Sequence, residues 1–280
     1  MISIKFPKKI SENEIKKFFV SEGLKDFVPK KKYIVDGYEV TKKDFEKKKK
    51  DKKNKFDIRK TFNPQPPELQ DLYRLYQFIL LNKRTTVLEF GCGYSSILIS
   101  KALKKLRLKN KKKLPFARCK YPFQLFIIDN VKKYLNIVKK RLKKYLVYEN
   151  VNFFYSKAQM TIYKDNFATE YLELPRVNPD FIYLDGPNPF TINNSKNNFT
   201  VSNPDMMPMS CDILKFENYL TPGTIIVIDG RAANARFLKN NFKRNWKEFF
   251  EKDHDQTIFL LDEKPLGPFN IEQIKFYKKT

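Results

Sequence analysis

The 280-residue chain has one histidine and three cysteines, so side chains that bind transition metals are scarce. The cysteines are widely spaced and form no Cys-x-x-Cys pair, which argues against a zinc site and favours a chain that stays reduced in the cytoplasm. The histidine, His254, lies in a predicted loop between two closing strands. From this loop position we interpret it as exposed rather than catalytic. No Ser-His-Asp or Cys-His arrangement can be assembled around it.

Long apolar runs are absent as well. The longest aliphatic stretches, 78–81 and 224–228, are too short to cross a membrane. The first residues, MISIKFPKKISENE, have no apolar signal-peptide core. The sequence therefore predicts a cytoplasmic protein without a transmembrane segment.

Acidic residues are outnumbered, since 56 Lys and Arg stand against 31 Asp and Glu and give a formal net charge of +25. Such a charge is typical of proteins that bind nucleic acid or an anionic surface. The lysines are spread over many segments, however, and we favour a lysine-rich composition, typical of an AT-rich genome, as their explanation. Binding of RNA or DNA by the basic surface is the alternative.

Residues 1–60 are predicted to form a Lys-rich N-terminal extension. A capping-box-like Ser-Glu-Asn-Glu begins at Ser11 and predicts a short helix after it. The basic run at 47–55 is typical of a solvated helix or a loose segment. Prolines at 64, 66 and 67 mark the boundary to a domain predicted over 61–280.

Strands and helices alternate after residue 66, which predicts a doubly wound, mostly parallel α/β sheet. One of the helices is expected to begin after Ser210 as its N-cap. Another is expected to carry an apolar side that runs from Val131 to Leu146. The strands are expected at 85–90, 124–128, 151–155, 180–184, 224–228, 246–250 and 257–261.

The stretch 87–96, VLEFGCGYSS, combines a buried strand, a Gly-x-Gly turn and two serines that can cap the next helix. Such a unit forms a cradle at the carboxyl end of a parallel strand, where α/β sheets bind nucleotide cofactors. Cys92 inside the turn is interpreted as a residue of suitably small size. The carboxylate, glycines and serines of this unit are Glu89, Gly91, Gly93, Ser95 and Ser96.

Glu89-Phe-Gly-Cys-Gly93 resembles motif I of the class I S-adenosylmethionine-dependent methyltransferases, an acidic residue followed by x-Gly-x-Gly. It matches the dinucleotide fingerprint less well, because Ser96 replaces the third glycine. Ser95 stands where many methyltransferases have a further glycine. Longer stretches, such as NPDFIYLDGP, are similar to uncharacterised methyltransferase-like proteins of bacteria. The resemblance covers about residues 66–262 and implies a seven-stranded Rossmann-like methyltransferase sheet with a final antiparallel hairpin.

The resemblance also implies S-adenosylmethionine as cofactor. Asp129 would hold the ribose hydroxyls, and its distance from the Gly-x-Gly turn implies a Lys-rich insertion at 104–122. Glu89 would orient the positively charged end of the cofactor, and the two glycines would leave room for its methionyl part. The loop that touches adenine corresponds to Ser156 and Ala158, and Ser95 belongs to the same cofactor site.

Three core strands are followed directly by a carboxylate, Asp129, Asp185 or Asp229, and Glu89 stands one residue before the end of its strand. Because parallel strands end at one edge of a sheet, we expect these carboxylates to form a shared site. We expect Asp185 and Asp229 to be catalytic residues beside the transferred methyl group, where either could take the acceptor proton, and Asp185 is the candidate base. Asp185 and Asp229 also resemble the aspartates of metal-dependent O-methyltransferases, which implies Mg²⁺, although Gly230 replaces the Asn of the catechol type. The alternative is that both aspartates only cap turns.

The predicted activity is O-methylation of a small hydroxylated molecule or a saccharide. Methylation of a nucleic-acid base ranks lower, because Asn188-Pro189-Phe190 lacks the second proline of that signature. A non-catalytic scaffold with the same fold is a third reading. Arg231 could bind an anionic acceptor or pair with an acidic residue of the edge. The loop 187–209, with Asn193 among its amides, is expected to cover the acceptor site.

Overall fold

The computed structural model describes residues 2–29, 31–35, 38–51, 65–110, 120–192, 194–203 and 205–278. The chain divides into a small unit of residues 8–73 and a large unit that joins residues 1–7 to 74–280. The boundary predicted between residues 60 and 61 lies outside the described residues and stays a prediction. Among the residues described, none of the helices is both long and apolar enough to cross a bilayer.

The small unit begins with a capped helix, as predicted. The Ser11 hydroxyl accepts a hydrogen bond from the Glu14 N–H (3.4 Å), and the Glu14 carboxylate accepts one from the Ser11 N–H (2.8 Å), which completes the capping box. The basic run predicted at 47–55 starts in the last turn of a second helix, and its residues 52–55 lie outside the described part. The elements are α1 (Glu12–Ser21), η1 (Lys25–Phe27), β1 (Ile34–Val35), β2 (Tyr38–Glu39) and α2 (Lys42–Lys50).

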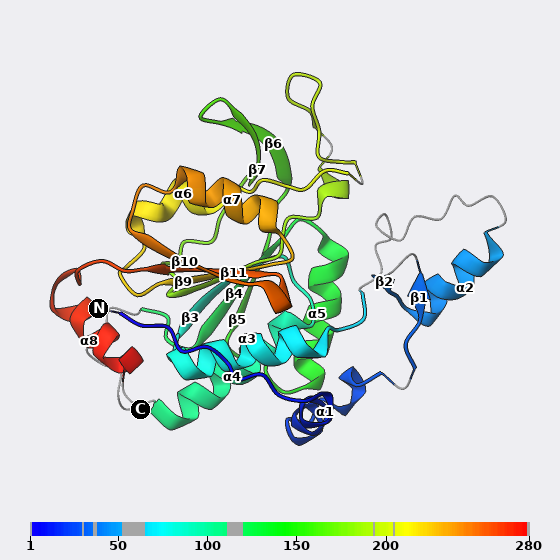
Figure 1. The fold of residues 1–280 in the computed structure, drawn as a ribbon, viewed down its shortest axis with the longest axis horizontal. Coiled ribbons are helices and arrows are strands. Elements are labelled where there is room, and N and C mark those ends of the chain that lie inside the picture. Colours follow the sequence, from blue (N-terminus) through cyan, green and yellow to red (C-terminus); the bar gives the residue numbers. More distant parts are fainter. Residues whose placement is uncertain are drawn as a thin grey trace. The chain divides into compact units, whose positions relative to one another are not determined.

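The large unit contains a seven-stranded sheet in the order β10-β11-β9-β8-β3-β4-β5 (Figure 1). The five strands from β9 to β5 are parallel, whereas β11 is antiparallel to both β9 and β10. The predicted mostly parallel sheet with a closing antiparallel hairpin is therefore confirmed. Its strands are β3 (Thr86–Phe90), β4 (Gln124–Asp129), β5 (Val151–Tyr155), β8 (Phe181–Leu184), β9 (Ile225–Asp229), β10 (Trp246–Glu251) and β11 (Gln256–Leu261).

Helices cover both faces of this sheet (Figure 1). One face is covered by α4 (Ser95–Asn110), α5 (Lys132–Lys144) and the part of α3 (Leu69–Asn82) from residue 74. The other is covered by α6 (Asp212–Phe216) and α7 (Ala232–Asn241). Since side chains alternate along a strand, every second strand residue enters the core on the α6/α7 face. These residues include Leu88, Phe90, Phe126, Ile128, Ile182, Leu184, Ile226 and Ile228.

A C-terminal helix, α8 (Gly267–Lys278), closes the amino ends of the strands and was not predicted. Its Tyr277 hydroxyl donates to the buried Asp180 carboxylate (2.8 Å), which also accepts from the N–H groups of Thr85 and Thr86. The Arg84 guanidinium lies 3.7 Å from the centre of the Tyr277 ring. This buried polar cluster fixes the amino edge of the sheet, so the opposite, carboxyl edge is the one available for chemistry.

The connection from β5 to β8 is a second unpredicted feature, because it contains a β-hairpin in place of a helix. Strands β6 (Ala158–Tyr163) and β7 (Asn166–Tyr171) pair antiparallel around Lys164 and Asp165, which both have positive φ. Two such residues are typical of the tight hairpin turns usually made by Asn-Gly or Asp-Gly. The sequence Lys-Asp does not carry that signal.

The prediction that Ser210 caps a helix was wrong. The chain at Ser210 runs extended beside β7, with a bridge to Thr169, so the helix begins only at Asp212. The Ser210 hydroxyl donates to the Asp212 carboxylate (2.9 Å) instead of accepting from the helix. The helix ends at Phe216, and the chain continues as η4 (Glu217–Tyr219). Leu146, expected on the apolar side of α5, lies beyond that helix and is 77% exposed.

Candidate active site

Strand register brings the predicted carboxylates to one edge of the sheet. Ile228 pairs with Leu184, Leu184 with Phe90, and Phe90 with Ile128. The residues that follow these four therefore lie level across β9, β8, β3 and β4. They are Asp229, Asp185, Gly91 and Asp129.

Glu89 is fully buried one residue before the end of β3. The Ser95 hydroxyl donates to one of its carboxylate oxygens (2.5 Å) and the Ser96 hydroxyl to the other (2.6 Å). Burial raises the pKa of Glu89 to about 8, and the two serine hydrogen bonds only partly oppose this. The serines were expected to cap α4 with their side chains, but their hydroxyls bind Glu89. The start of α4 is thereby tied to a carboxyl group that is mostly protonated at neutral pH.

Asp129 is also buried, at the end of β4. Its carboxylate accepts hydrogen bonds from the Val131 N–H (2.7 Å) and from the thiol and N–H of Cys92. Burial raises the pKa of Asp129 to about 6, although these hydrogen bonds favour the charged form. Cys92 was interpreted only as a residue of small size, but in the structure it also orients this carboxylate. Cys92 and Cys211 are free thiols, while Cys119 lies outside the described residues.

The two glycines of the turn have different surroundings. Gly91 has φ +84°, and a Cβ there would lie 2.9 Å from the Asp185 carbonyl carbon and oxygen. Gly186 and Gly91 lie equally close together, because a Cβ added to Gly186 would lie 2.5 Å from the Gly91 nitrogen. A Cβ at Gly93 would meet only the Ser95 hydroxyl oxygen, at 3.9 Å. Gly91 is thus required by the approach of β3 to β8, whereas only Gly93 leaves open space in the turn.

We expect Gly91→Ala and Gly93→Ala to separate folding from ligand binding. Gly91→Ala should destabilise the fold by roughly 2–4 kcal/mol, through left-handed backbone strain and the clash with Asp185. Gly93→Ala should leave the unfolding midpoint near that of the wild type and weaken ligand affinity roughly tenfold. Chemical denaturation and calorimetry of both variants test this. Equal destabilisation by the two substitutions would contradict it.

Asp185 follows β8 and keeps a side chain that is 57% exposed. The Arg231 guanidinium lies 3.4 Å from its carboxylate and donates to its backbone carbonyl (2.7 Å). Arg231 also contacts the Pro187 carbonyl, at 3.5 Å. Of the two roles left open for Arg231, the structure therefore contains the pairing with an acidic residue of the edge. This pairing fixes the chain as it leaves β8.

Asp229 is held from two neighbouring strands. It accepts a hydrogen bond from the Tyr183 hydroxyl (2.7 Å) and one from the Gln256 side-chain amide (3.3 Å). Donors thus already occupy both of its oxygens, and Arg231 faces Asp185. Within the described ranges, no group of three His, Cys, Asp or Glu could hold a metal ion. The predicted Mg²⁺ site at Asp185 and Asp229 does not fit this donor set, and we derive no step through a metal.

Ser156 and Ala158, predicted beside adenine, lie where the chain leaves β5 and enters β6. The Ser156 N–H donates to the Asp129 carbonyl (3.2 Å), so this turn lies next to the end of β4. Ser156 also lines a cavity of about 390 Å³ together with Phe126, Phe154 and Arg176. Ala158 is buried in the core of the α6/α7 face.

Tyr171, at the end of β7, is an edge residue that the sequence did not indicate. Its ring packs against Phe90 (5.9 Å between centroids), and its N–H donates to the Asp212 carboxylate (3.0 Å). The hydroxyl is buried, lies 2.7 Å from the position of a Gly186 Cβ, and has no hydrogen-bond partner among the described residues. A buried unpaired hydroxyl costs about 1–3 kcal/mol, which makes it a candidate ligand contact.

The loop expected to cover the acceptor site is anchored at Asn188 and again at Asn194. The Asn130 amide donates to the Asn188 carbonyl (3.0 Å), and the Asn188 N–H donates back to Asn130 (3.0 Å). Further along, Asn194 exchanges two hydrogen bonds with the backbone of Met160 in β6. The short helix η3 (Pro189–Thr191) lies between these anchors. Asn193 lies outside the described residues, and the covering role stays a prediction.

His254 lies in η5 (Lys252–His254), between β10 and β11 as predicted, and is half-buried rather than exposed. The turn is close to the carboxyl edge, because the Gly230 N–H donates to the Asp255 carbonyl (3.1 Å). The antiparallel hairpin therefore brings the single histidine near the end of β9. Its position in the sequence, 25 residues after Asp229, carried no sign of this.

Neither a protein-family model nor a curated protein matches the chain. Among solved structures, the O-methyltransferase TomG of Streptomyces achromogenes aligns at 15% identity and TM-score 0.40, covering 70% of this chain and 82% of its own. The Bacillus cereus O-methyltransferase aligns at 12% identity and TM-score 0.39, covering 70% and 82%. The Podospora anserina methyltransferase PaMTH1 aligns at 12% identity and TM-score 0.41, covering 93% and 100%. At these values the fold assignment rests on the strand order described above.

Proposed function

We propose that the protein is an S-adenosylmethionine-dependent methyltransferase that methylates a hydroxyl group of a small molecule or a saccharide. The observation that carries this proposal is the cradle at the carboxyl end of β3 and β4. There an open turn at Gly93 lies between the buried carboxyl groups of Glu89 and Asp129. A cytoplasmic location is part of the proposal, supported by the free thiols of Cys92 and Cys211.

The residues of the cradle fit the parts of this cofactor. Asp129 has acceptor capacity beyond the donors it already binds, and a carboxylate can accept hydrogen bonds from two ribose hydroxyls. Gly93 leaves space for the methionyl part, because nothing but Ser95 lies near its missing Cβ. Glu89, bonded to Ser95 and Ser96, would lose its proton when the positive charge of the bound cofactor lowers its pKa, and the carboxylate would then attract that charge. Ser156, which lines the cavity beside the end of β4, would flank the adenine, whereas Ala158 is buried in the core.

When bound, S-adenosylmethionine would supply a methyl group attached to a positively charged sulfur, which is the leaving group when the methyl carbon passes to an acceptor oxygen. The protein must align the acceptor hydroxyl and take up its proton. Asp185 is exposed at the same edge and is a suitable base for that proton. Arg231 would hold Asp185 in place, and Asp229 would act as a positioning residue through Tyr183. This proton transfer needs no metal ion.

Asp129→Ala is expected to weaken S-adenosylmethionine binding by about 1–3 kcal/mol, since hydrogen bonds to the ribose are lost. Asp129→Asn keeps the shape and one acceptor oxygen, so it should fall between the wild type and the alanine variant. Isothermal titration calorimetry measures both. Unchanged affinity in the alanine variant would remove Asp129 from the cofactor site.

A screen of hydroxylated acceptors with methyl-labelled cofactor, with and without chelator, tests the activity itself. The proposal predicts label transfer to a small hydroxylated compound or a saccharide at a rate that chelator leaves unchanged. Loss of transfer on chelation would mean that the reaction requires a metal ion. Transfer only to nucleic acid would mean that the acceptor is a nucleic acid and not a small molecule. Cofactor binding without transfer to any acceptor would favour the scaffold reading.

A further inference from the structure

Helix α5 is strongly basic and has no acidic residue. Its sequence KKYLNIVKKRLKK holds seven Lys and Arg and neither Asp nor Glu. The apolar side of this helix is buried and consists of Leu135, Val138 and Leu142. The positive side chains are therefore confined to the remaining surface of the helix, beside the edge strand β5.

Three of these lysines lie over three aromatic rings. The Lys132 ammonium is 4.6 Å from the centre of the Tyr155 ring, and Lys139 is 5.0 Å from Phe153. Lys143 is 5.2 Å from Tyr148, whose ring stacks on that of Phe153 at 5.7 Å. Residues spaced by seven and by four positions lie on one side of a helix. We call these six residues, Lys132, Lys139, Lys143, Tyr148, Phe153 and Tyr155, the α5–β5 stripe.

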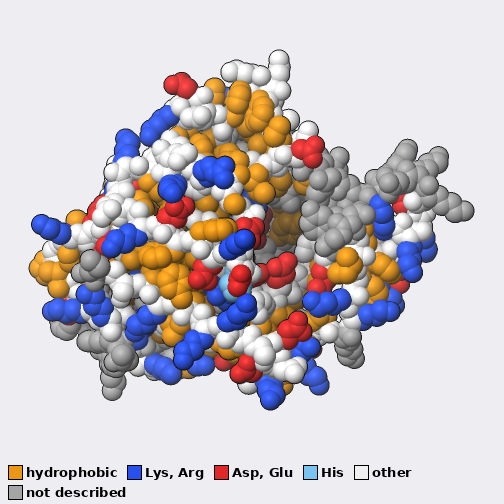
Figure 2. Space-filling view, viewed as in Figure 1, with side chains coloured by type: hydrophobic (Ala, Val, Ile, Leu, Met, Phe, Trp, Pro, Cys, Tyr) orange, Lys and Arg blue, Asp and Glu red, His pale blue; other side chains and the backbone are white. Residues whose placement is uncertain are grey.

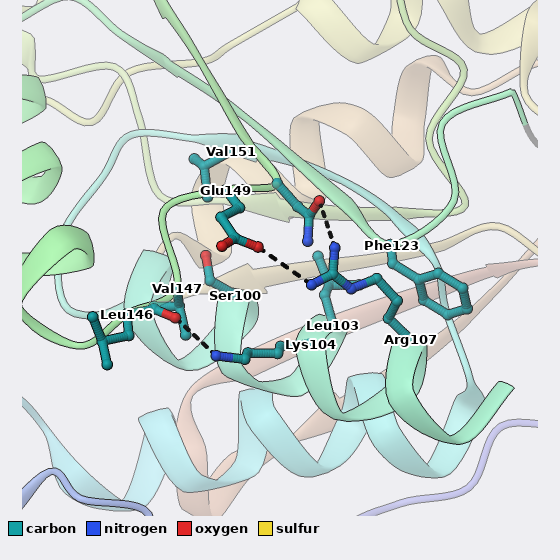
Figure 3. A pocket seen from close by; sticks show the side chains of 10 residues that line it. Ser100, Leu103, Lys104, Arg107, Phe123, Leu146, Val147, Glu149 and Val151 are labelled. Atoms are coloured by element: carbon teal, nitrogen blue, oxygen red, sulfur yellow. Dashed lines mark hydrogen bonds and ion pairs between the residues drawn. The ribbon is translucent and has the colours of Figure 1, made fainter. Parts of the chain in front are cut away.

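Charge alone does not distinguish this stripe, because basic side chains are scattered over the face shown in Figure 2. Two cations of the neighbouring helix α4, Lys104 and Arg107, are engaged within the protein. Figure 3 shows Lys104 donating to the Leu146 carbonyl (2.9 Å), and Arg107 bonded to Asn150 (3.1 Å) and Glu149 (3.5 Å). What distinguishes the stripe is the alternation of lysines with ring faces along β5, which is the edge strand of the sheet in the described part of the chain.

We propose that the α5–β5 stripe binds single-stranded nucleic acid. Lysines neutralise phosphates, and aromatic faces stack on unpaired bases without regard to sequence. An exposed cation over a ring is held by only about 0.5–1 kcal/mol, so a base can take its place while the ammonium turns to a phosphate. Lys132 to Lys143 span roughly 16 Å of helix, a length that several phosphates of one strand can follow. Tyr155, 41% exposed, is the most open of the three rings.

The proposal does not depend on the proposed methyl transfer, because the stripe is defined by contacts outside the cradle. Its test uses the full chain and a fluorescent RNA of about 12 nucleotides, a length in the range of single-strand sites. Anisotropy at several salt concentrations gives affinity and salt dependence. The variants are Lys132→Glu/Lys139→Glu/Lys143→Glu and a matched control, Lys264→Glu/Lys275→Glu/Lys278→Glu. The control replaces three exposed lysines, two in α8 and one just before it, and changes the net charge by the same amount.

The stripe variant is expected to lose roughly tenfold or more in affinity and to show a shallower salt slope, while the control loses about threefold or less. Tyr155→Ala should weaken binding and leave the salt slope unchanged, because stacking involves no counterion. Equal losses in the two charge variants would overturn the proposal, as would tighter binding to duplex than to single strands. Binding of vesicles containing anionic lipid, with no binding of RNA, would assign the stripe to a membrane surface instead.

Discussion

Asp185→Asn is expected to lower methyl transfer by about 10²–10⁴-fold, the usual contribution of a general base. The amide cannot take up the acceptor proton, but it retains the size of the side chain and an oxygen that faces Arg231. Cofactor affinity should therefore stay within about twofold of the wild type, since Asp129 and Gly93 are untouched. Single-turnover rates with labelled cofactor, together with calorimetry, measure the two quantities separately.

Asp229→Asn is the matched control for this experiment. Asp229 ends the neighbouring strand, but its oxygens are bonded to Tyr183 and Gln256, and an amide oxygen can keep the tyrosine bond. We expect a loss of about tenfold or less, as for a positioning residue. If the Asp229 variant were as inactive as the Asp185 variant, the two carboxylates would act as a unit. Full activity of Asp185→Asn would remove Asp185 as the base.

Glu89→Gln is expected to flatten the pH dependence of stability above pH 6. The pKa of Glu89 is raised from 4.5 to about 8, so the folded protein holds a proton that the unfolded chain releases. The stability that this proton contributes is present below pH 4.5 and is lost as the pH rises through 8. Between pH 6 and pH 9 the wild type should lose about 2–3 kcal/mol more than the variant.

The window avoids the contribution of Asp129, whose pKa is raised only to about 6. Urea unfolding at several pH values gives the comparison, and Glu149→Gln, which alters an exposed glutamate, serves as control. The control should follow the wild type. A Glu89→Gln profile that also follows the wild type would mean that Glu89 is ionised at neutral pH and that its burial is compensated elsewhere.

The core of the fold could be predicted because its signals are local. The strands that end at Phe90, Ile128 and Leu184 are apolar runs bounded by turn residues, and alternation with helices implies a parallel sheet. The hairpin β6–β7 was missed because its turn, Lys164-Asp165, lacks glycine. Helix α8 was missed because its fixing contacts, Tyr277 with Asp180 and Arg84, join residues far apart in the chain. Propensity does not register such tertiary contacts.

The candidate site, like the fold, could be predicted only in part. The positions of Glu89 and Asp129 followed from strand ends, because register at one edge is a general property of parallel sheets. Their surroundings did not follow from the sequence, since a serine after a turn predicts a cap and not a partner for a buried carboxyl group. Asp185 pairs with Arg231 because Arg231 follows the end of β9. Tyr171 lies beside Gly186 because it ends the unpredicted hairpin. Only the folded chain brings these residues together.

The most direct test of the central claim is calorimetric titration of the wild-type protein with S-adenosylmethionine, S-adenosylhomocysteine and NAD. Glu89, Gly93 and Asp129 predict saturable binding of both methionine-derived ligands and none of NAD under the same conditions. Binding of NAD, with no heat from either methionine-derived ligand, would contradict the account and assign the cradle to a dinucleotide.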